Sequence, residues 1–238
     1  MFGLFKTKNP FEILEKQRKD FLNIQLPEQI RSSFKQPIAN KDIMFDQLSL
    51  LVLDFETTGG EPSQDHIISM GWVEVHQKQI DLALKKHFYL NNSEQITHQT
   101  AVVNQIVPEM LEQGSSLDKA MTSLFSHCQN RVLVVHGKVI EKGFIDYYMQ
   151  QKYGVSELPL LWIDTMKIEV WLANKLGGNT LSQDNRLTAV RKRYQLPQYN
   201  AHNALVDSLA TAELLLAQIA RIYRNKPVTL ETLYKISQ

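Results

Sequence analysis

The stretch LSLLVLDFETTGG, at positions 48–60, constrains the fold more than any other part of this 238-residue chain. Its apolar run is typical of a buried β-strand, and the run ends in two carboxylates, Asp54 and Glu56. Residues i and i+2 of a strand share one face, so both side chains point the same way. Like charges side by side repel, and burying either without a partner is costly. A divalent cation between them would remove both costs. The simpler alternative is a strand that ends in an acidic Thr–Gly turn.

The chain from position 48 onward alternates between strand and helix patterns. The sequence predicts five strands, at 48–56, 65–75, 78–90, 131–136 and 158–165. It predicts helices at 115–128, 139–154, 166–176, 187–196 and 203–223. The first three strands follow one another closely and read as an antiparallel meander, whereas the later strands are separated by helices. This order predicts an α/β fold, a mixed sheet with helices packed on it.

Residues 1–45 differ in pattern from the rest of the chain. Their apolar residues are loosely spaced, as in short amphipathic helices, and prolines interrupt them. We therefore expect an N-terminal helical extension at 1–45 and one domain at 46–238. No apolar run approaches the ~18 residues that span a bilayer. The single cysteine excludes an internal disulfide, so a cytoplasmic protein without membrane association is expected.

The net charge of +1 argues against a protein that coats nucleic acid without selectivity, because such proteins are usually far more basic. A polyanionic substrate must then be held by a local basic patch or by metal ions. The densest basic stretch is RLTAVRKRY, at 186–194. A solvated helix face is the simpler interpretation of this stretch.

Further acidic residues occur where other strands end and helices begin. The fourth predicted strand ends at His136, and Glu141 follows in the first turns of the next helix. Asp207 lies near the start of the last long helix, with His202 just before that helix begins. In open α/β sheets these positions converge at the carboxyl ends of the strands. Hard oxygen ligands suit Mg²⁺ or Mn²⁺. Two such ions can promote phosphoryl transfer, and a nearby histidine can take the proton of the attacking water.

These stretches resemble the motifs of the DnaQ-like 3′–5′ exonucleases that carry a histidine in their third motif (DEDDh). This family includes the proofreading epsilon subunit of bacterial DNA polymerase III. The segments LDFETTG, VVHGKVIEKGF and HNALVDSLATAELL are similar to the first, second and third motifs, and the resemblance covers about residues 48–222. The sister group has a tyrosine four residues before its last aspartate. Asn203 occupies that position here, and His202 stands five residues before Asp207, which favours the histidine group.

The resemblance implies a ribonuclease H-like fold, with a five-stranded mixed sheet flanked by helices. It implies metal-dependent hydrolysis of phosphodiester bonds at the 3′ end of single-stranded nucleic acid, DNA foremost, with release of nucleoside 5′-monophosphates. It further implies two Mg²⁺ or Mn²⁺ ions, His202 as general base, and contacts to substrate by Thr57, Thr58 and His136. The metal ligands implied are Asp54, Glu56, Glu141 and Asp207.

Two positions depart from the second motif of the family. Gly137 stands where the family has asparagine, and Glu141 stands where it has aspartate. The second change lengthens a carboxylate whose reach to metal is part of the mechanism, so loss of catalysis stays an open alternative. Asp146 is a second acid on the same helix, but the spacing from His136 favours Glu141. Asp164 and Thr165, in the stretch WIDTMKI, are expected to be structural.

Two other functions fit the same motifs. One is an exoribonuclease that trims RNA 3′ ends, because nothing in the sequence separates DNA from RNA. The other is a non-catalytic module of the same fold that binds nucleic acid or a partner protein. The acidic residues argue against the second, since like charges are costly without metal. The extra length is N-terminal, so we expect a protein partner, if there is one, to bind residues 1–45, and we do not expect a polymerase subunit.

Overall fold

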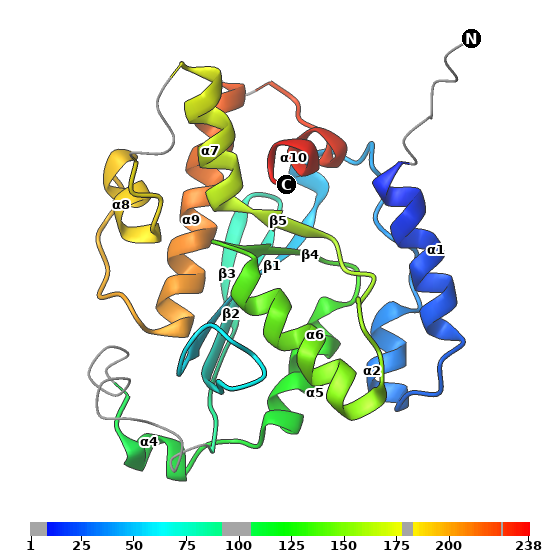
Figure 1. Cartoon of the computed structure of the whole chain (residues 1–238). Coiled ribbons are helices and arrows are strands. Elements are labelled where there is room, and N and C mark those ends of the chain that lie inside the picture. Colours follow the sequence, from blue (N-terminus) through cyan, green and yellow to red (C-terminus); the bar gives the residue numbers. More distant parts are fainter. Residues whose placement is uncertain (1–8, 92–105, 178–182, 225) are drawn as a thin grey trace.

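The structure, a computed structural model, describes residues 9–91, 106–177, 183–224 and 226–238. A five-stranded mixed sheet in the order β3-β2-β1-β4-β5 runs through the described residues (Figure 1). β1 pairs antiparallel with β2, and β2 with β3, whereas β4 and β5 join in parallel. The strands are β1 (Ser49–Thr57), β2 (Ile67–His76), β3 (Gln79–Tyr89), β4 (Val132–Val135) and β5 (Trp162–Asp164). The predicted mixed sheet is confirmed, although its last strand is shorter than expected.

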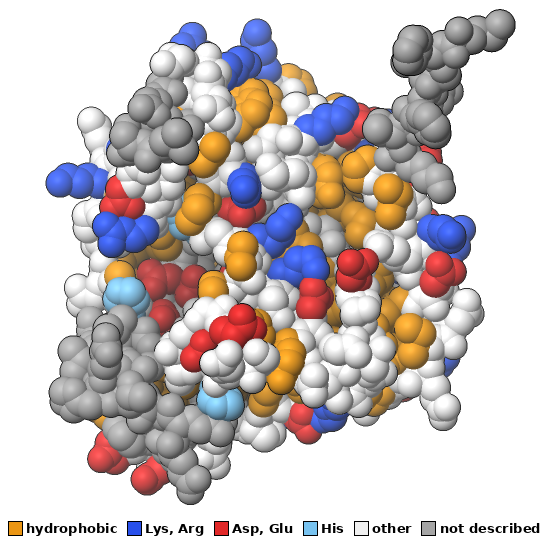
Figure 2. Space-filling view, in the orientation of Figure 1, with side chains coloured by type: hydrophobic (Ala, Val, Ile, Leu, Met, Phe, Trp, Pro, Cys, Tyr) orange, Lys and Arg blue, Asp and Glu red, His pale blue; other side chains and the backbone are white. Residues whose placement is uncertain are grey.

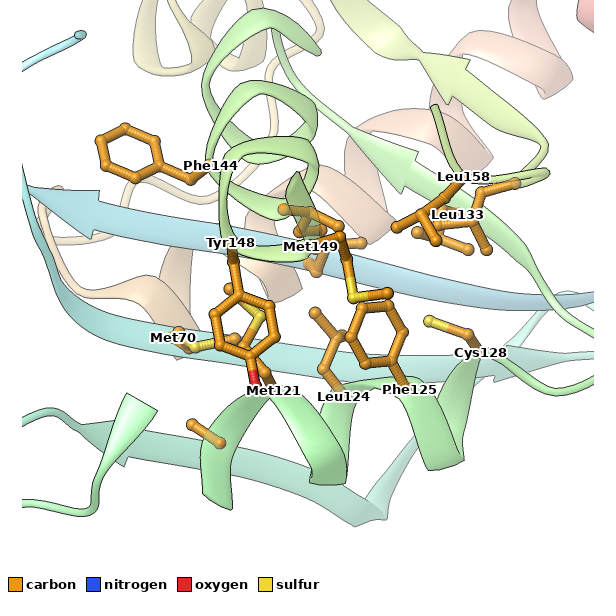
Figure 3. Close-up of a cluster of buried hydrophobic side chains, with 14 of the residues drawn as sticks. Met70, Met121, Leu124, Phe125, Cys128, Leu133, Phe144, Tyr148, Met149 and Leu158 are labelled. Atoms are coloured by element: carbon orange, nitrogen blue, oxygen red, sulfur yellow. The ribbon is translucent and has the colours of Figure 1, made fainter. Parts of the chain in front are cut away.

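Helices cover both faces of the sheet, and alternation along β1 decides which residues meet each layer. Leu51 and Leu53 pack in the core beneath α5 (Leu117–Cys128) and α6 (Val139–Tyr153). Figure 3 shows side chains of these two helices pointing toward each other over the sheet. Leu50 and Val52 face the opposite core, which contains α7 (Thr165–Lys175), α9 (Ala204–Tyr223) and α10 (Leu230–Ile236). Because side chains alternate, Asp54 points to the α9 face.

The N-terminal helix expected from the sequence is present, and it packs against the domain. Phe21 of α1 (Pro10–Leu22) and Phe34 of η1 (Ser32–Phe34) join the core beneath α5. Phe11 joins the opposite core, with its ring centroid 5.3 Å from that of Tyr234. The short helix α2 (Glu28–Arg31) lies between Phe21 and Phe34 in the sequence. The described part of the extension therefore contributes to both cores. Residues 1–8 lie outside the described residues.

The basic stretch at 186–194 is solvated at Arg186, Lys192 and Arg193, as its charge predicts, but not at Arg191. It forms α8 (Leu187–Arg193), in which Arg191 is only 2% exposed. The guanidinium of Arg191 donates to the backbone oxygens of Pro197 and Ala210 and pairs with Glu213. These bonds fasten α8 to α9, because a buried guanidinium needs acceptors for its donors.

Two further short helices complete the described structure, α4 (Pro108–Glu112) and η2 (Phe45–Gln47). The sequence patterns did not predict α4. Among the described helices, none combines the length and the apolar character needed to cross a membrane.

Candidate active site

Three carboxylates from distant parts of the chain meet at the end of β1. Oxygens of Asp54, Glu56 and Asp207 lie within 4.8 Å of one another. The first two come from the last residues of β1, and Asp207 comes from the first turn of α9. None of the ion pairs found among the described residues involves any of the three. Figure 2 shows acidic side chains gathered in a hollow beside a histidine.

The pKa values of these carboxyl groups reflect their crowding. Burial, and then the charges of Asp207 and Glu141, raise the pKa of Glu56 to about 8. Burial, followed by the neighbouring carboxylates, raises the pKa of Asp54 well above its ordinary value. The pKa of Asp207 is raised as well, mainly by burial. A cluster of this kind ionises fully only when a cation offsets its charge. Its donors are hard oxygens, which fit Mg²⁺ or Mn²⁺.

Glu141 lies beside this cluster but outside the group of three. It is in the first turn of α6 and only 5% exposed. Burial raises its pKa to about 8, and its charge in turn raises the pKa of Asp54. Its Oε2 atom is buried without a hydrogen-bond partner. An orphaned carboxylate oxygen next to three other carboxylates fits a role in holding a second cation. Asp146, the alternative acid on α6, pairs instead with Lys142.

The position of α6 depends on Asp164, which caps two helices at once. One carboxylate oxygen accepts the backbone N–H of Met166 at 2.9 Å, in the first turn of α7. The same carboxylate accepts the N–H groups of Gly137 and Lys138, each at 3.0 Å, where α6 begins. Gly137 has φ +97°, which side-chain-bearing residues rarely adopt, and this accounts locally for glycine in place of asparagine. Asp164 is therefore structural.

His136 already has a partner on each ring nitrogen. Its Nε2 donates to the backbone oxygen of Asn185 at 2.7 Å, and its Nδ1 lies 2.8 Å from the hydroxyl of Thr165. The imidazole is nearly buried between these groups, and its pKa is lowered by that burial. His136 thus connects the end of β4 to the segment before α8. The contact of this side chain with substrate stays a prediction.

Thr57 and Thr58 shape the loop that follows β1. The hydroxyl of Thr57 donates to the backbone oxygen of Gly59 at 2.7 Å. The hydroxyl of Thr58 donates to the Asp65 carboxylate at 3.1 Å and accepts the backbone N–H of His66. A Cβ on Gly59 would fall 2.5 Å from that carboxylate, so any larger residue there would displace the Asp65 side chain. These bonds hold the loop at the edge of the acidic cluster, and the contact of both threonines with substrate stays a prediction.

His202 is exposed and stands directly before α9. Its φ is +68°, and its backbone N–H donates to the Asp207 carboxylate at 2.8 Å. Asn203, the N-cap of α9, also donates its backbone N–H to that carboxylate. The Asp207 carboxylate, a member of the acidic cluster, therefore also holds the segment that carries His202. This arrangement places the residue beside Asp207 of the acidic cluster.

A cleft of about 490 Å³ adjoins His202, and the sequence did not point to it. Its wall includes Ser69, His87 and Tyr89 from the face of β2 and β3 that also carries the acidic cluster. The hydroxyl of Ser69 lies 2.8 Å from Nε2 of His87. The sequence feature that could have indicated this cleft wall is the alternation along β3, which puts residues 87 and 89 on one face of the sheet.

Comparison with known proteins adds a family and a fold. The family model RNase_T, described as an exonuclease, matches residues 51–215. The chain is 27% identical over 176 residues to a DNA polymerase III PolC-type of Thermotoga petrophila, covering 74% of this chain and 12% of that protein. It is 24% identical over 211 residues to the PolC-type polymerase of Staphylococcus aureus, covering 84% of this chain and 14% of that protein. The chain thus spans a small part of these relatives.

Solved structures share the fold at low sequence identity. Cell-death related nuclease 4 (CRN-4) has a TM-score of 0.64 at 18% identity, with 74% of this chain and 65% of that chain covered. The nuclease domain of 3′hExo, a DEDDh family member bound to rAMP, has a TM-score of 0.61 at 14% identity, with 76% and 96% covered. Exonuclease X in complex with 5′ overhanging duplex DNA has a TM-score of 0.59 at 21% identity, with 79% and 99% covered. The sheet and its helices are ribonuclease H-like.

Proposed function

Because the chain belongs to the RNase_T exonuclease family, we propose that it is a metal-dependent 3′–5′ exonuclease. Its substrate would be the 3′ end of single-stranded nucleic acid, DNA foremost, and its products nucleoside 5′-monophosphates. The observation that carries the proposal is the convergence of Asp54, Glu56 and Asp207 within 4.8 Å, without a cationic side chain paired to them among the described residues. In a non-catalytic protein without a bound cation, the repulsion within such a cluster would lower the stability of the fold.

Divalent cations bound at this cluster would supply an activated water and offset the charge that develops during phosphoryl transfer. Asp54, Glu56 and Asp207 are the residues that would hold one ion. Glu141, with its orphaned oxygen, would help to hold another. Glutamate in place of aspartate is compatible with this role, because its carboxylate already lies close enough to raise the pKa of Asp54.

His202 would act as the general base. Its side chain is exposed at the mouth of a cleft, and its backbone is fastened to Asp207. A neutral imidazole in that position can accept the proton of a water that attacks the terminal phosphodiester. The loop formed by Thr57 and Thr58 would border the terminal nucleotide on the other side of the cluster.

Hydrolysis of end-labelled substrates tests the proposal. We would incubate the protein with 5′-labelled single-stranded DNA and RNA of one sequence, with Mg²⁺, with Mn²⁺ or with chelator. The expected result is a ladder that shortens from the 3′ end, depends on metal, and is lost in Asp207→Asn. Faster hydrolysis of RNA would make RNA the substrate. Cleavage of a circular single strand, or undiminished activity in chelator, would overturn the proposed function.

A further inference from the structure

Three lysines gather where α6 and α7 begin. Lys138 is the N-cap of α6, Lys142 follows four residues later on the same side of that helix, and Lys167 lies in the first turn of α7. The backbone N–H groups of Lys138 and Lys167 donate to the two oxygens of the Asp164 carboxylate, at 3.0 and 3.4 Å. The two lysines therefore stand on either side of one side chain. We call Lys138, Lys142 and Lys167 the lysine cluster.

The positive charge of the lysine cluster is only partly offset. The Asp164 carboxylate inside it is already engaged by four backbone N–H groups. Lys142 pairs with Asp146, whereas Nζ of Lys138 meets the neutral amide oxygen of Gln238 at 3.0 Å. Burial lowers the pKa of Lys138, and the charges of the other two lysines lower it further against the effect of Asp164. Crowded like charges of this kind are relieved by an anion.

The lysine cluster lies next to the acidic cluster, with α6 between them. Glu141 is on the inner side of the first turn of α6, where its charge acts on Asp54. Lys138 and Lys142 flank it in sequence and reach solvent. Figure 2 shows Lys and Arg side chains in the middle of this face, to the right of the acidic hollow. Val139, the first residue of α6, is 81% exposed.

We propose that the lysine cluster binds the phosphodiester backbone of the nucleic-acid strand, upstream of the nucleotide that is removed. Val139 would contact the sugars or bases of the same stretch. The inference rests on the proposed function and extends it to the path of the strand. A chain with a net charge of +1 needs a local patch to hold a polyanion, and this patch adjoins the catalytic carboxylates. Lysines contact phosphates without reading sequence, so binding here would not select bases.

A binding measurement tests the proposal without relying on turnover. In an Asp54→Asn background, we would compare Lys138→Gln/Lys142→Gln/Lys167→Gln with its parent, using fluorescence anisotropy of a long single-stranded oligothymidylate over a range of salt. The expected loss of affinity at low salt is about 10- to 100-fold. The slope of log affinity against log salt should become shallower by about 2, since each phosphate contact on a single strand contributes ~0.7.

The matched control removes the same charge elsewhere. Lys16 and Lys19 lie on α1, and Lys78 lies in the turn between β2 and β3, at the end of the sheet where β1 begins. These lysines are outside the proposed path, so Lys16→Gln/Lys19→Gln/Lys78→Gln should bind nearly as tightly as the parent. Thermal unfolding of both triple variants checks that each is folded. Lys167→Gln alone, at an exposed position, removes one charge of the lysine cluster with little risk to folding. If the cluster and control variants lose the same affinity, binding depends on the net charge of the protein and not on the position of these lysines, and the proposal is overturned.

Kinetics with two substrate lengths separates this inference from the proposed function. In the active protein, the cluster variant should raise KM for the long strand, with KM for a dinucleotide and kcat both unchanged. Equal effects on both substrates, or none on the long one, would contradict a role upstream of the cleaved bond. If the wild-type chain binds DNA through these lysines but hydrolyses nothing, the proposed function fails and the binding path stands.

Discussion

Gly71 of β2 lies directly against the backbone of Ala204, the first residue of α9. A Cβ built on Gly71 would fall 2.3 Å from the carbonyl carbon of Ala204, a distance that real Cβ atoms do not reach. Gly71 is also the partner of Asp54 in the β1–β2 register. The missing side chain therefore lets α9 approach the sheet beside Asp54, and this approach brings Asp207 to the same place.

Gly71→Ala should consequently disturb both the fold and the acidic cluster. The neighbour is backbone, which cannot rotate away, so we expect a loss of about 1–3 kcal/mol in unfolding free energy. Affinity for Mn²⁺ should fall too, because α9 carries Asp207. Gly60→Ala is the control, since its Cβ would meet only a side-chain methyl at 3.7 Å. Chemical denaturation and Mn²⁺ titration measure the two effects, and an unperturbed Gly71→Ala would contradict this view of how α9 docks.

Asp54→Asn should abolish nuclease activity while leaving the metal-free protein as stable as the wild type or more so. The change removes one of several crowded charges, which relieves repulsion. It also removes a metal ligand, so Mn²⁺ should raise the thermal midpoint of the wild type and not that of the variant. Turnover and thermal unfolding, each with and without Mn²⁺, give the answer. Full activity in the variant would refute the assignment of Asp54.

The stability of the metal-free protein should depend on pH in a direction set by the raised pKa values. Glu56 and Glu141 have an ordinary pKa of 4.5, raised to about 8 in the folded state. Between these values the folded state holds protons that the unfolded state releases, so stability falls as pH rises toward 8. The contribution is complete below the ordinary pKa and lost above about 8.

Thermal unfolding in chelator between about pH 5 and pH 9 measures this dependence. Glu56→Gln should flatten it, because the amide does not titrate. Mn²⁺ should reverse it, because the cation binds the ionised carboxylates and competes with their protons. A wild-type profile identical to that of Glu56→Gln would show that the group does not titrate as inferred.

His202→Asn should lower kcat by about 10²- to 10⁴-fold, the usual contribution of a positioned general base. Asparagine is a better replacement than alanine, because it tolerates the positive φ of this position. The imidazole is exposed, so the thermal midpoint should change little. Single-turnover rates and substrate affinity are the measurements. A variant that loses binding but keeps its rate at saturation would assign His202 to positioning.

Glu141→Gln should cost orders of magnitude in rate, and Glu141→Asp should be tolerated better, since it keeps a carboxylate that can reach a metal. Asp146→Asn is the control on the same helix and should be nearly silent, because Asp146 only pairs with Lys142. Steady-state rates with Mg²⁺ and Mn²⁺ distinguish the three variants. If Asp146→Asn is inactive and Glu141→Gln is active, Asp146 and not Glu141 is the functional acid of the second motif.

Local chemistry explains what could be predicted from the sequence by itself. The common face of Asp54 and Glu56 follows from strand periodicity, and the N-cap at Asn203 places Asp207 in the first turn of α9. Each of these relationships depends on residues a few positions apart. The order of strands and helices, and hence the mixed sheet, follows from the same short-range patterns.

Only the tertiary structure decided which distant groups meet. The docking of α9 depends on empty space at Gly71, which no local pattern records. Arg191 looked like a solvated charge until Glu213 and two carbonyl groups from other segments surrounded it. No local pattern indicates that Nε2 of His136 donates to the backbone oxygen of Asn185, 49 residues away. Burial and hydrogen-bond satisfaction are properties of the packed chain, so the same side chain can serve solvent, substrate or core according to what the fold places beside it.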